Sequence, residues 1–146
     1  HHWMQENFLR HVNIPAKNIH YPDGTVPLEK IAEHCQHYEA LIAQAGGIDL
    51  MLLGIGGNGH IGFNEPFSSR SSRTRLVTLD PGTRRALASD FFSEDNVPSQ
   101  AITMGLGTIL ASRKILLLAM GEHKATVIRA LAEGDVVDSP KKSSTG

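Results

Sequence analysis

The segment 48–66, IDLMLLGIGGNGHIGFNEP, decides the fold of this 146-residue chain. Its first part, Ile48 to Ile55, is a nearly continuous apolar run, which is typical of a strand covered on both faces in a parallel sheet. A glycine-rich loop follows the run directly. Because open α/β sheets bind ligands at the carboxyl ends of their strands, we expect this loop to carry the functional site.

Strands and helices alternate around this segment. Alternation of apolar and polar residues predicts a further strand at 74–79, and an apolar run predicts one at 114–120. A change from strand to helix is expected within 101–110. Helical periodicity predicts helices at 3–12, from Pro27 to a glycine stop at Gly46-Gly47, at 81–92, in the second part of 101–110 and at 124–132. This order predicts an α/β fold, an open and mostly parallel sheet with helices on both faces.

The composition restricts the class of protein. Fourteen basic and fifteen acidic residues give a net charge of -1, so nucleic acid is an unfavourable partner. No apolar run approaches the roughly 20 residues of a membrane helix, and the start resembles no secretory signal. Cys35 is the only cysteine, which favours a reducing, cytoplasmic location. We expect one domain over 1–137 and a disordered polar tail over 138–146.

The loop after the first strand combines an imidazole with a carboxylate. His60 can exchange protons near neutral pH, and Glu65 can orient its ring. Asn58 adds an amide that donates to an oxygen or holds the histidine. Gly56 and Gly57 let a substrate approach main-chain N–H groups. A capped loop histidine without function is the alternative, but the position after a buried strand favours proton transfer.

The run Gly56 to Pro66 resembles the signature loop of glucosamine-6-phosphate deaminases, a family with a modified doubly wound α/β fold that is related to 6-phosphogluconolactonases. Further similar segments follow in the family's order: 7–15, 71–75, 101–105 and 121–125. The resemblance covers nearly the whole chain except its tail. It implies that residues 1–137 form the C-terminal two-thirds of one domain that is incomplete at its N-terminus.

The resemblance implies a role for each matched residue. His60 takes the proton of the sugar's anomeric hydroxyl and returns one to the ring oxygen, while Glu65 supports it. Asn58 stands where many relatives have Asp and some have Asn, which implies a positional role. Lys124 matches a lysine that contacts the substrate phosphate. The implied reaction converts glucosamine 6-phosphate and water to fructose 6-phosphate and ammonia in amino-sugar catabolism, without metal or organic cofactor.

The chain also departs from the family pattern. The family's phosphate-cradling Ser/Thr-Gly loop, and the carboxylate that moves a proton between C2 and C1, lie upstream of the matched region. Many relatives have a phosphate-binding Arg before the Phe-Phe pair, where this chain reads Ala88-Ser89-Asp90-Phe91-Phe92, so Arg84 or Arg85 could compensate. Activated members bind a regulator through Arg75 and a lysine two residues later. Val77 stands at that second position and argues against such activation.

Several other functions stay open on sequence alone. A 6-phosphogluconolactonase shares a Gly-His loop, although Asn64-Glu65-Pro66 argues against it. A galactosamine-6-phosphate deaminase would use the same ring-opening groups on an epimer. A non-catalytic sugar-phosphate sensor would bind such ligands without turnover.

His34 and His37, one helical turn apart beside Cys35, suggest a metal site, but no second pair of ligands is spaced to complete it. A homo-oligomer also stays open.

Overall fold

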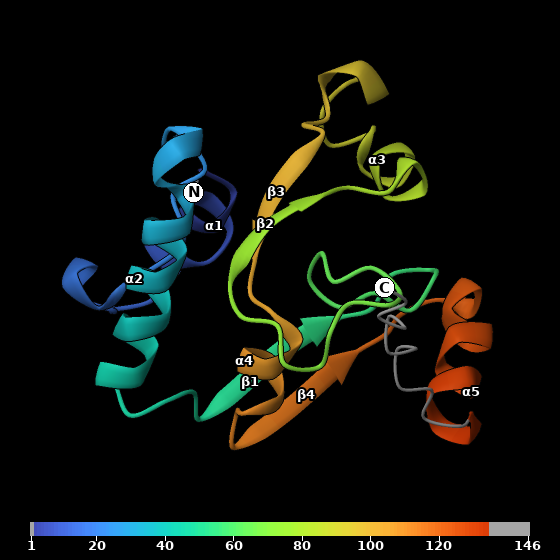
Figure 1. The fold of residues 1–146 in the computed structure, drawn as a ribbon. Coiled ribbons are helices and arrows are strands. Elements are labelled where there is room, and N and C mark those ends of the chain that lie inside the picture. The colour runs from blue at the N-terminus through green and yellow to red at the C-terminus, as the bar shows by residue number, and fades with distance from the viewer. Residues whose placement is uncertain (1, 135–146) are drawn as a thin grey trace, which may run out of the picture.

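The computed structural model describes residues 2–134, and the element order confirms the α/β class (Figure 1). Two helices come first, α1 (His2–Asn7) and α2 (Ile31–Gln44). Strands and helices then alternate as β1 (Leu50–Gly54), β2 (Arg75–Thr78), α3 (Pro81–Leu87), β3 (Gln100–Thr103), α4 (Leu106–Leu110), β4 (Lys114–Leu118) and α5 (Ala125–Glu133). The predicted disordered tail, 138–146, lies outside the described residues.

Helix α2 confirms the predicted glycine stop. Gly46 and Gly47 have φ angles of 84° and 92°, and the Gly47 N–H donates to the Ile42 carbonyl at 2.9 Å. Residues with a Cβ rarely adopt this left-handed turn. At the other end, a 3-10 turn over Leu28–Lys30 precedes the helix, and the Leu28 side chain is 66% exposed. The predicted start at Pro27 is therefore followed by a 3-10 turn, and α2 itself begins at Ile31.

Two predicted helices are shorter in the structure. The helix expected at 3–12 ends at Asn7, and a 3-10 turn takes up Leu9–His11. None of the α1 side chains is buried, so tertiary packing does not extend the helix. The helix expected at 81–92 ends at Leu87, and Phe92 has a φ of 67°, which a right-handed helix excludes. Periodicity predicted these helices but not their ends.

The strands form two separate pairs. β1 and β4 are parallel, in a register from Leu50 opposite Lys114 to Gly54 opposite Leu118. This pairing confirms the parallel sheet that the apolar runs predicted. β2 and β3 are antiparallel, in a register from Arg75 opposite Thr103 to Thr78 opposite Gln100. Alternation of strands and helices did not distinguish this antiparallel ribbon from a further parallel pair.

The parallel pair β1–β4 is covered less than its sequence predicts. Leu53, Ile115 and Leu117 line a hollow of about 480 Å³, and side chains from α4 and α5 line it too. On the opposite face the exposed fractions of Leu50, Leu52, Leu116 and Leu118 are 59%, 60%, 49% and 48%. Within the described residues, this second face of the parallel pair is not covered. We call these four leucines the open leucine face.

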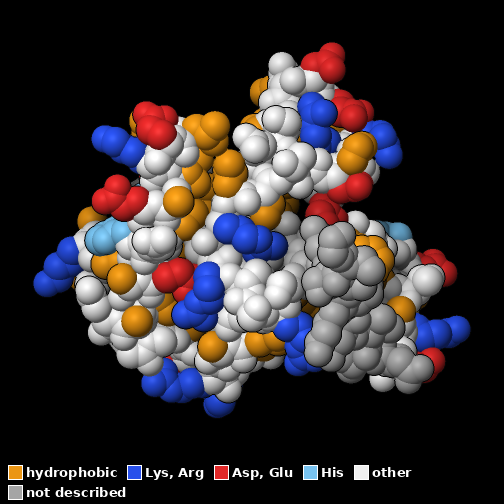
Figure 2. Space-filling view, viewed as in Figure 1, with side chains coloured by type: hydrophobic (Ala, Val, Ile, Leu, Met, Phe, Trp, Pro, Cys, Tyr) orange, Lys and Arg blue, Asp and Glu red, His pale blue; other side chains and the backbone are white. Residues whose placement is uncertain are grey.

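The buried apolar side chains of the described part are Cys35 in α2, Ile109 in α4, and Ile55, Leu79 and Val97 in the connections between elements. Helix α2 packs against β2, and α3 packs against the 3-10 turn Glu94–Asn96. Figure 2 shows basic and acidic side chains interspersed on one face, with hydrophobic side chains between them. Among the described residues, no helix is long and apolar enough to cross a membrane.

Candidate active site

The loop after β1 turns back so that His60 lies beside Gly56. The Gly56 N–H donates to the His60 carbonyl at 2.8 Å, and the Gly59 N–H donates to the Gly56 carbonyl at 3.1 Å. Gly59 adopts a φ of 90°, a conformation that favours glycine. This turn holds the half-buried His60 side chain next to the carboxyl end of β1.

The two neighbouring glycines of this loop differ in their surroundings. A Cβ on Gly56 would lie 2.3 Å from Cε1 of His60 and 2.5 Å from each ring nitrogen. A Cβ on Gly57 would meet no atom within 4 Å. The His60 ring therefore packs directly on Gly56, whereas Gly57 is open. Both were predicted to let a substrate approach the backbone, and Gly57 is the one with free space.

Asn58 determines which nitrogen of His60 carries the hydrogen. Its Oδ1 lies 2.7 Å from His60 Nδ1 and accepts the His60 backbone N–H at 3.1 Å. Its Nδ2 donates to Glu65 Oε2 at 2.8 Å. With the amide reversed, its NH2 group would face the His60 backbone N–H and its oxygen would face Glu65 Oε2, so this orientation is fixed. Because an amide oxygen only accepts, Nδ1 is protonated, and Nε2 of the neutral ring keeps its lone pair.

Glu65 joins this loop to α3. Its Oε1 accepts the Thr83 hydroxyl at 2.6 Å, and its Oε2 lies 3.4 Å from His60 Nδ1. Burial raises the pKa of Glu65, but hydrogen bonds from Thr83 and Asn58, the charge of His60 and a backbone hydrogen bond from Asp80 outweigh it, so the pKa is lowered. The carboxylate is therefore ionised near neutral pH and can stabilise a protonated His60.

Two hollows adjoin His60. One, of about 290 Å³, is lined by Gly54, Ile55, Gly56, His60 and Gly62. The other, of about 270 Å³, is lined by Gly57, Asn58, His60, Asp80, Gly82, Thr83 and Ala86. The imidazole thus has space for a small polar molecule on either side of it.

Lys124 lies at the same end of β1. Its Nζ donates to the Ile55 carbonyl at 2.7 Å, and Ile55 also lines the hollow of about 290 Å³. The structure therefore brings this predicted phosphate ligand to the loop. A lysine ammonium has three N–H donors, and the carbonyl takes one of them.

Sequence reasoning missed the residues that hold the second half of the loop. The Thr103 hydroxyl accepts the Phe63 N–H at 3.0 Å. The buried Asn64 donates to the Met104 carbonyl at 2.8 Å and accepts from Arg75 at 2.9 Å. Sequence reasoning also missed Thr83, the donor to Glu65. The only sequence sign for Thr83 is its place in the first turn of a helix that follows a predicted strand.

Two of the three arginines considered for phosphate or regulator binding, Arg75 and Arg84, have hydrogen-bond partners in the structure. Arg84 donates to the carbonyls of Glu94 and Val97 at 3.0 and 3.1 Å, whereas Arg85 is exposed. Arg75 donates to Asn64 and Ser68, and Val77 is a half-buried β2 residue. The predictions about phosphate compensation and regulation stay predictions.

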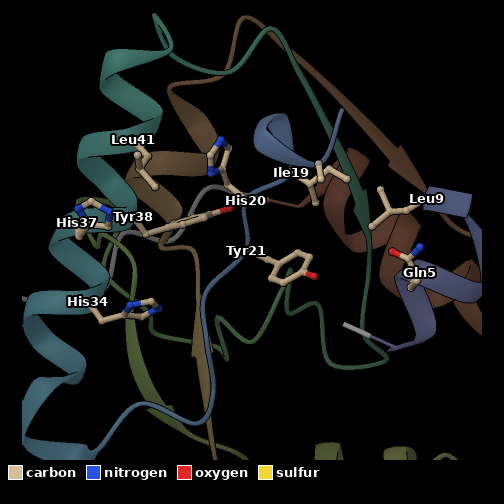
Figure 3. A pocket seen from close by; sticks show the side chains of 10 residues that line it. Gln5, Leu9, Ile19, His20, Tyr21, His34, His37, Tyr38 and Leu41 are labelled. Atoms are coloured by element: carbon tan, nitrogen blue, oxygen red, sulfur yellow. The ribbon is translucent and has the colours of Figure 1, made fainter. Parts of the chain in front are cut away.

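A separate cavity of about 310 Å³ lies between α2 and the N-terminal segment (Figure 3). His34 and His37 of α2 line it, together with His20. The His34 Nε2 accepts the Asp23 N–H at 2.8 Å. Within residues 2–134, no group of three or more His, Cys, Asp or Glu side chains could hold a metal ion. The metal site suggested by His34, His37 and Cys35 has no ligand set in this part of the chain.

Comparison with known proteins identifies related sequences. The model of the family "Glucosamine-6-phosphate isomerases/6-phosphogluconolactonase" matches residues 1–143. The glucosamine-6-phosphate deaminase of Oceanobacillus iheyensis is 49% identical over 136 residues, which is 93% of this chain and 54% of that protein. That of Shouchella clausii is 46% identical over 138 residues, 94% of this chain and 55% of that protein. The chain thus spans about half the length of these relatives.

Solved structures agree with this fold. A monomeric glucosamine-6-phosphate deaminase superposes with a TM-score of 0.87 at 46% identity, covering 92% of this chain and 55% of that one. A 6-phosphogluconolactonase from Trypanosoma cruzi superposes with a TM-score of 0.55 at 21% identity, covering 81% and 46%. The second likeness concerns the fold alone.

Proposed function

Because the chain belongs to the family of glucosamine-6-phosphate isomerases and 6-phosphogluconolactonases, we propose that it carries the ring-opening site of a glucosamine-6-phosphate deaminase. The overall reaction would convert glucosamine 6-phosphate and water to fructose 6-phosphate and ammonia. Relatives with that name at 46–49% identity support this choice over a lactonase, with which the chain shares 21% identity.

In the proposed ring opening, His60 acts as base and then as acid. Its Nε2 takes the proton of the anomeric hydroxyl, the bond between C1 and the ring oxygen breaks, and the protonated imidazole returns the proton to that oxygen. The observation that carries this proposal is the hydrogen bond between Nδ1 and Asn58, because it leaves Nε2 as the proton acceptor. Glu65 would stabilise the imidazolium formed between the two transfers.

We infer two further roles around this centre. Lys124 would bind the substrate phosphate with the N–H donors that Ile55 does not take. By the resemblance, a carboxylate upstream of the matched region transfers a proton from C2 to C1 of the opened sugar, before the C2 imine is hydrolysed. The proposal for His60, Asn58 and Glu65 therefore concerns ring opening.

Two assays test the proposal. The first measures ammonia and fructose 6-phosphate release from glucosamine 6-phosphate, with galactosamine 6-phosphate in parallel, by the protein as its gene encodes it. We expect His60→Gln to lower the rate at least about 100-fold. His37→Gln, a substitution far from the loop, is the matched control and should leave the rate unchanged. Turnover by the His60→Gln variant at the parent rate would refute the role of His60.

The second assay isolates ring opening. Exchange NMR of glucosamine 6-phosphate measures interconversion of its two anomers, which requires an open chain but no enolisation. We expect the 146-residue chain to accelerate this exchange and His60→Gln to abolish the acceleration. Binding of the sugar phosphate without exchange or turnover would instead favour a sensor.

A further inference from the structure

Thr83 makes a contact that the proposed ring opening does not yet use. The side chain belongs to the first turn of α3 and is buried, with 6% of the residue exposed. Its hydroxyl donates to Glu65 Oε1 at 2.6 Å across 18 residues of sequence. The Asp80 side chain caps the same turn by accepting the Gly82 N–H at 2.7 Å, and Pro81 begins the helix. The donor to Glu65 is therefore held by a capped helix terminus.

The two oxygens of Glu65 have different partners. Oε1 faces Thr83, whereas Oε2 accepts from Asn58 at 2.8 Å and lies 3.4 Å from His60 Nδ1. The terminal torsion of a glutamate is broad, so a carboxylate held at one oxygen only can rotate. A donor on Oε1 restricts that rotation and keeps Oε2 directed at Asn58 and His60.

We propose that Thr83 is a positioning residue of the proton-transfer site, holding Glu65 so that its Oε2 orients Asn58 and faces the ring of His60. The effect of Thr83 on catalysis rests on the proposed function. Its hydrogen bond to Glu65 does not depend on that function. The chain of contacts runs from Thr83 through Glu65 and Asn58 to His60. Thr83 itself donates to Glu65 and acts through it.

The choice of variants follows from the chemistry of this contact. Thr83→Val keeps the shape of the side chain and removes the hydroxyl donor, whereas Thr83→Ser keeps the donor. The matched control is Thr108→Val. Thr108 is also a buried threonine whose hydroxyl donates to a carboxylate, Glu39, at 2.7 Å, but it lies outside the loop.

The first measurement is a carbon-13 NMR titration of the Glu65 carboxyl group in the whole chain. Loss of the Thr83 hydrogen bond removes a stabiliser of the ionised form, so Thr83→Val should raise the pKa of Glu65 above that of the parent. Thr83→Ser and Thr108→Val should leave it near the parent value. An unchanged titration of Glu65 in a folded Thr83→Val variant would overturn the proposal.

The second measurement is the pH dependence of turnover by the protein as its gene encodes it. Thr83→Val should lower kcat roughly tenfold, with KM nearly unchanged, because a hydrogen bond to a charged group is lost. The acid limb of the pH profile should move to higher pH, and Thr83→Ser should restore both. A uniform loss at every pH, with no movement of the acid limb, would contradict a positioning role.

If Thr83→Val does not fold, the same two measurements are made on Thr83→Cys and Thr83→Ser. A thiol is a much weaker donor than a hydroxyl, so only Thr83→Cys should change the titration of Glu65 and the pH profile. The two proposals fail in different ways. A parent without deaminase activity would defeat the proposed function, while the Glu65 titration would still decide whether Thr83 holds the carboxylate.

Discussion

The His60 ring rests directly on the Gly56 backbone, so residue 56 determines where the imidazole can lie. A Cβ added at residue 56 would lie 2.3–2.5 Å from three atoms of the His60 ring. The proton on Nδ1 depends on the ring's distance to Asn58, so displacement of the ring also disturbs the hydrogen bond that leaves Nε2 basic. Backbone and acid–base chemistry are therefore coupled at one residue.

We expect Gly56→Ala to keep the fold and to lower turnover on the order of 100-fold, because a shift of about 1 Å at a catalytic group has that effect. Gly24→Ala is the control, since its Cβ would meet nothing within 4 Å and it lies outside the loop. Turnover of both variants, with imidazole nitrogen shifts from NMR, checks this. A Gly56→Ala variant with the turnover of the parent would show that the contact between residue 56 and the His60 ring does not matter.

At the residue scale the sequence predicted His60, Asn58 and Glu65 as a group because they share one short loop after an apolar strand. The structure brings these three within hydrogen-bonding reach. Thr83 could not be predicted in the same way. Its contact to Glu65 depends on how α3 returns to the loop, and a single threonine carries no periodic signal.

At the scale of elements, one carboxylate ties three of them together. Glu39 of α2 accepts the Thr74 N–H at 2.8 Å before β2 and the Thr108 hydroxyl of α4 at 2.7 Å. The Thr74 hydroxyl donates to it as well, and Arg73 lies 3.3 Å from its second oxygen. Helix α2 is therefore joined to the antiparallel ribbon by polar contacts in addition to apolar packing.

Glu39→Leu should lower the free energy of unfolding by about 3 kcal/mol, the upper end for buried donors left without an acceptor. Glu33→Leu, on an exposed position of the same helix, should change it by less than about 0.5 kcal/mol. Urea unfolding followed by circular dichroism measures both. A Glu39→Leu variant as stable as the parent would mean that apolar packing alone holds α2 in place.

Acid should destabilise the fold through the same carboxylate. Burial raises the pKa of Glu39, but hydrogen bonds from Thr74 and Thr108 and the charge of Arg73 outweigh it and lower the pKa below its ordinary 4.5. The folded state then binds protons less readily than the unfolded state. This stability is fully present above about pH 4.5 and is lost as pH falls through the lower folded-state pKa. We expect the urea midpoint of unfolding to fall less steeply with decreasing pH in Glu39→Leu than in the parent protein.

Element types followed from the sequence better than their ends did. The glycine stop of α2 was predicted because two adjacent glycines allow a left-handed turn, and the structure confirms it. The end of α3 was not predicted, because no proline or glycine marks it and the pattern of apolar residues continues beyond Leu87. The antiparallel direction of β2–β3 depends on pairing between distant segments, which local patterns do not encode.

At the scale of the whole molecule, the open leucine face is an apolar surface that the described residues leave uncovered. An apolar run on both faces of a strand predicts burial, yet the described chain leaves Leu50, Leu52, Leu116 and Leu118 about half exposed or more. Local pattern shows which residues favour burial, but what covers them depends on distant elements. Contiguous exposed apolar surface of this kind favours association.

We expect the double variant Leu52→Gln and Leu116→Gln to bind less of the hydrophobic dye ANS and to self-associate less in sedimentation velocity. Leu28→Gln is the control, because Leu28 is 66% exposed but lies away from β1 and β4. Dye binding by the double variant equal to that of the parent would show that the open leucine face is covered in solution.

The parallel pairing of β1 with β4 also sets an order of events during synthesis. Asp49, just before β1, and Arg113, just before β4, form an ion pair 64 residues apart in sequence. At about 5–20 residues per second, a ribosome needs roughly 3–13 s to add the second strand after the first. The leucines of β1 spend that interval without their partner strand. A nascent chain of this protein therefore carries an apolar strand segment for seconds before its parallel ladder with β4 can form.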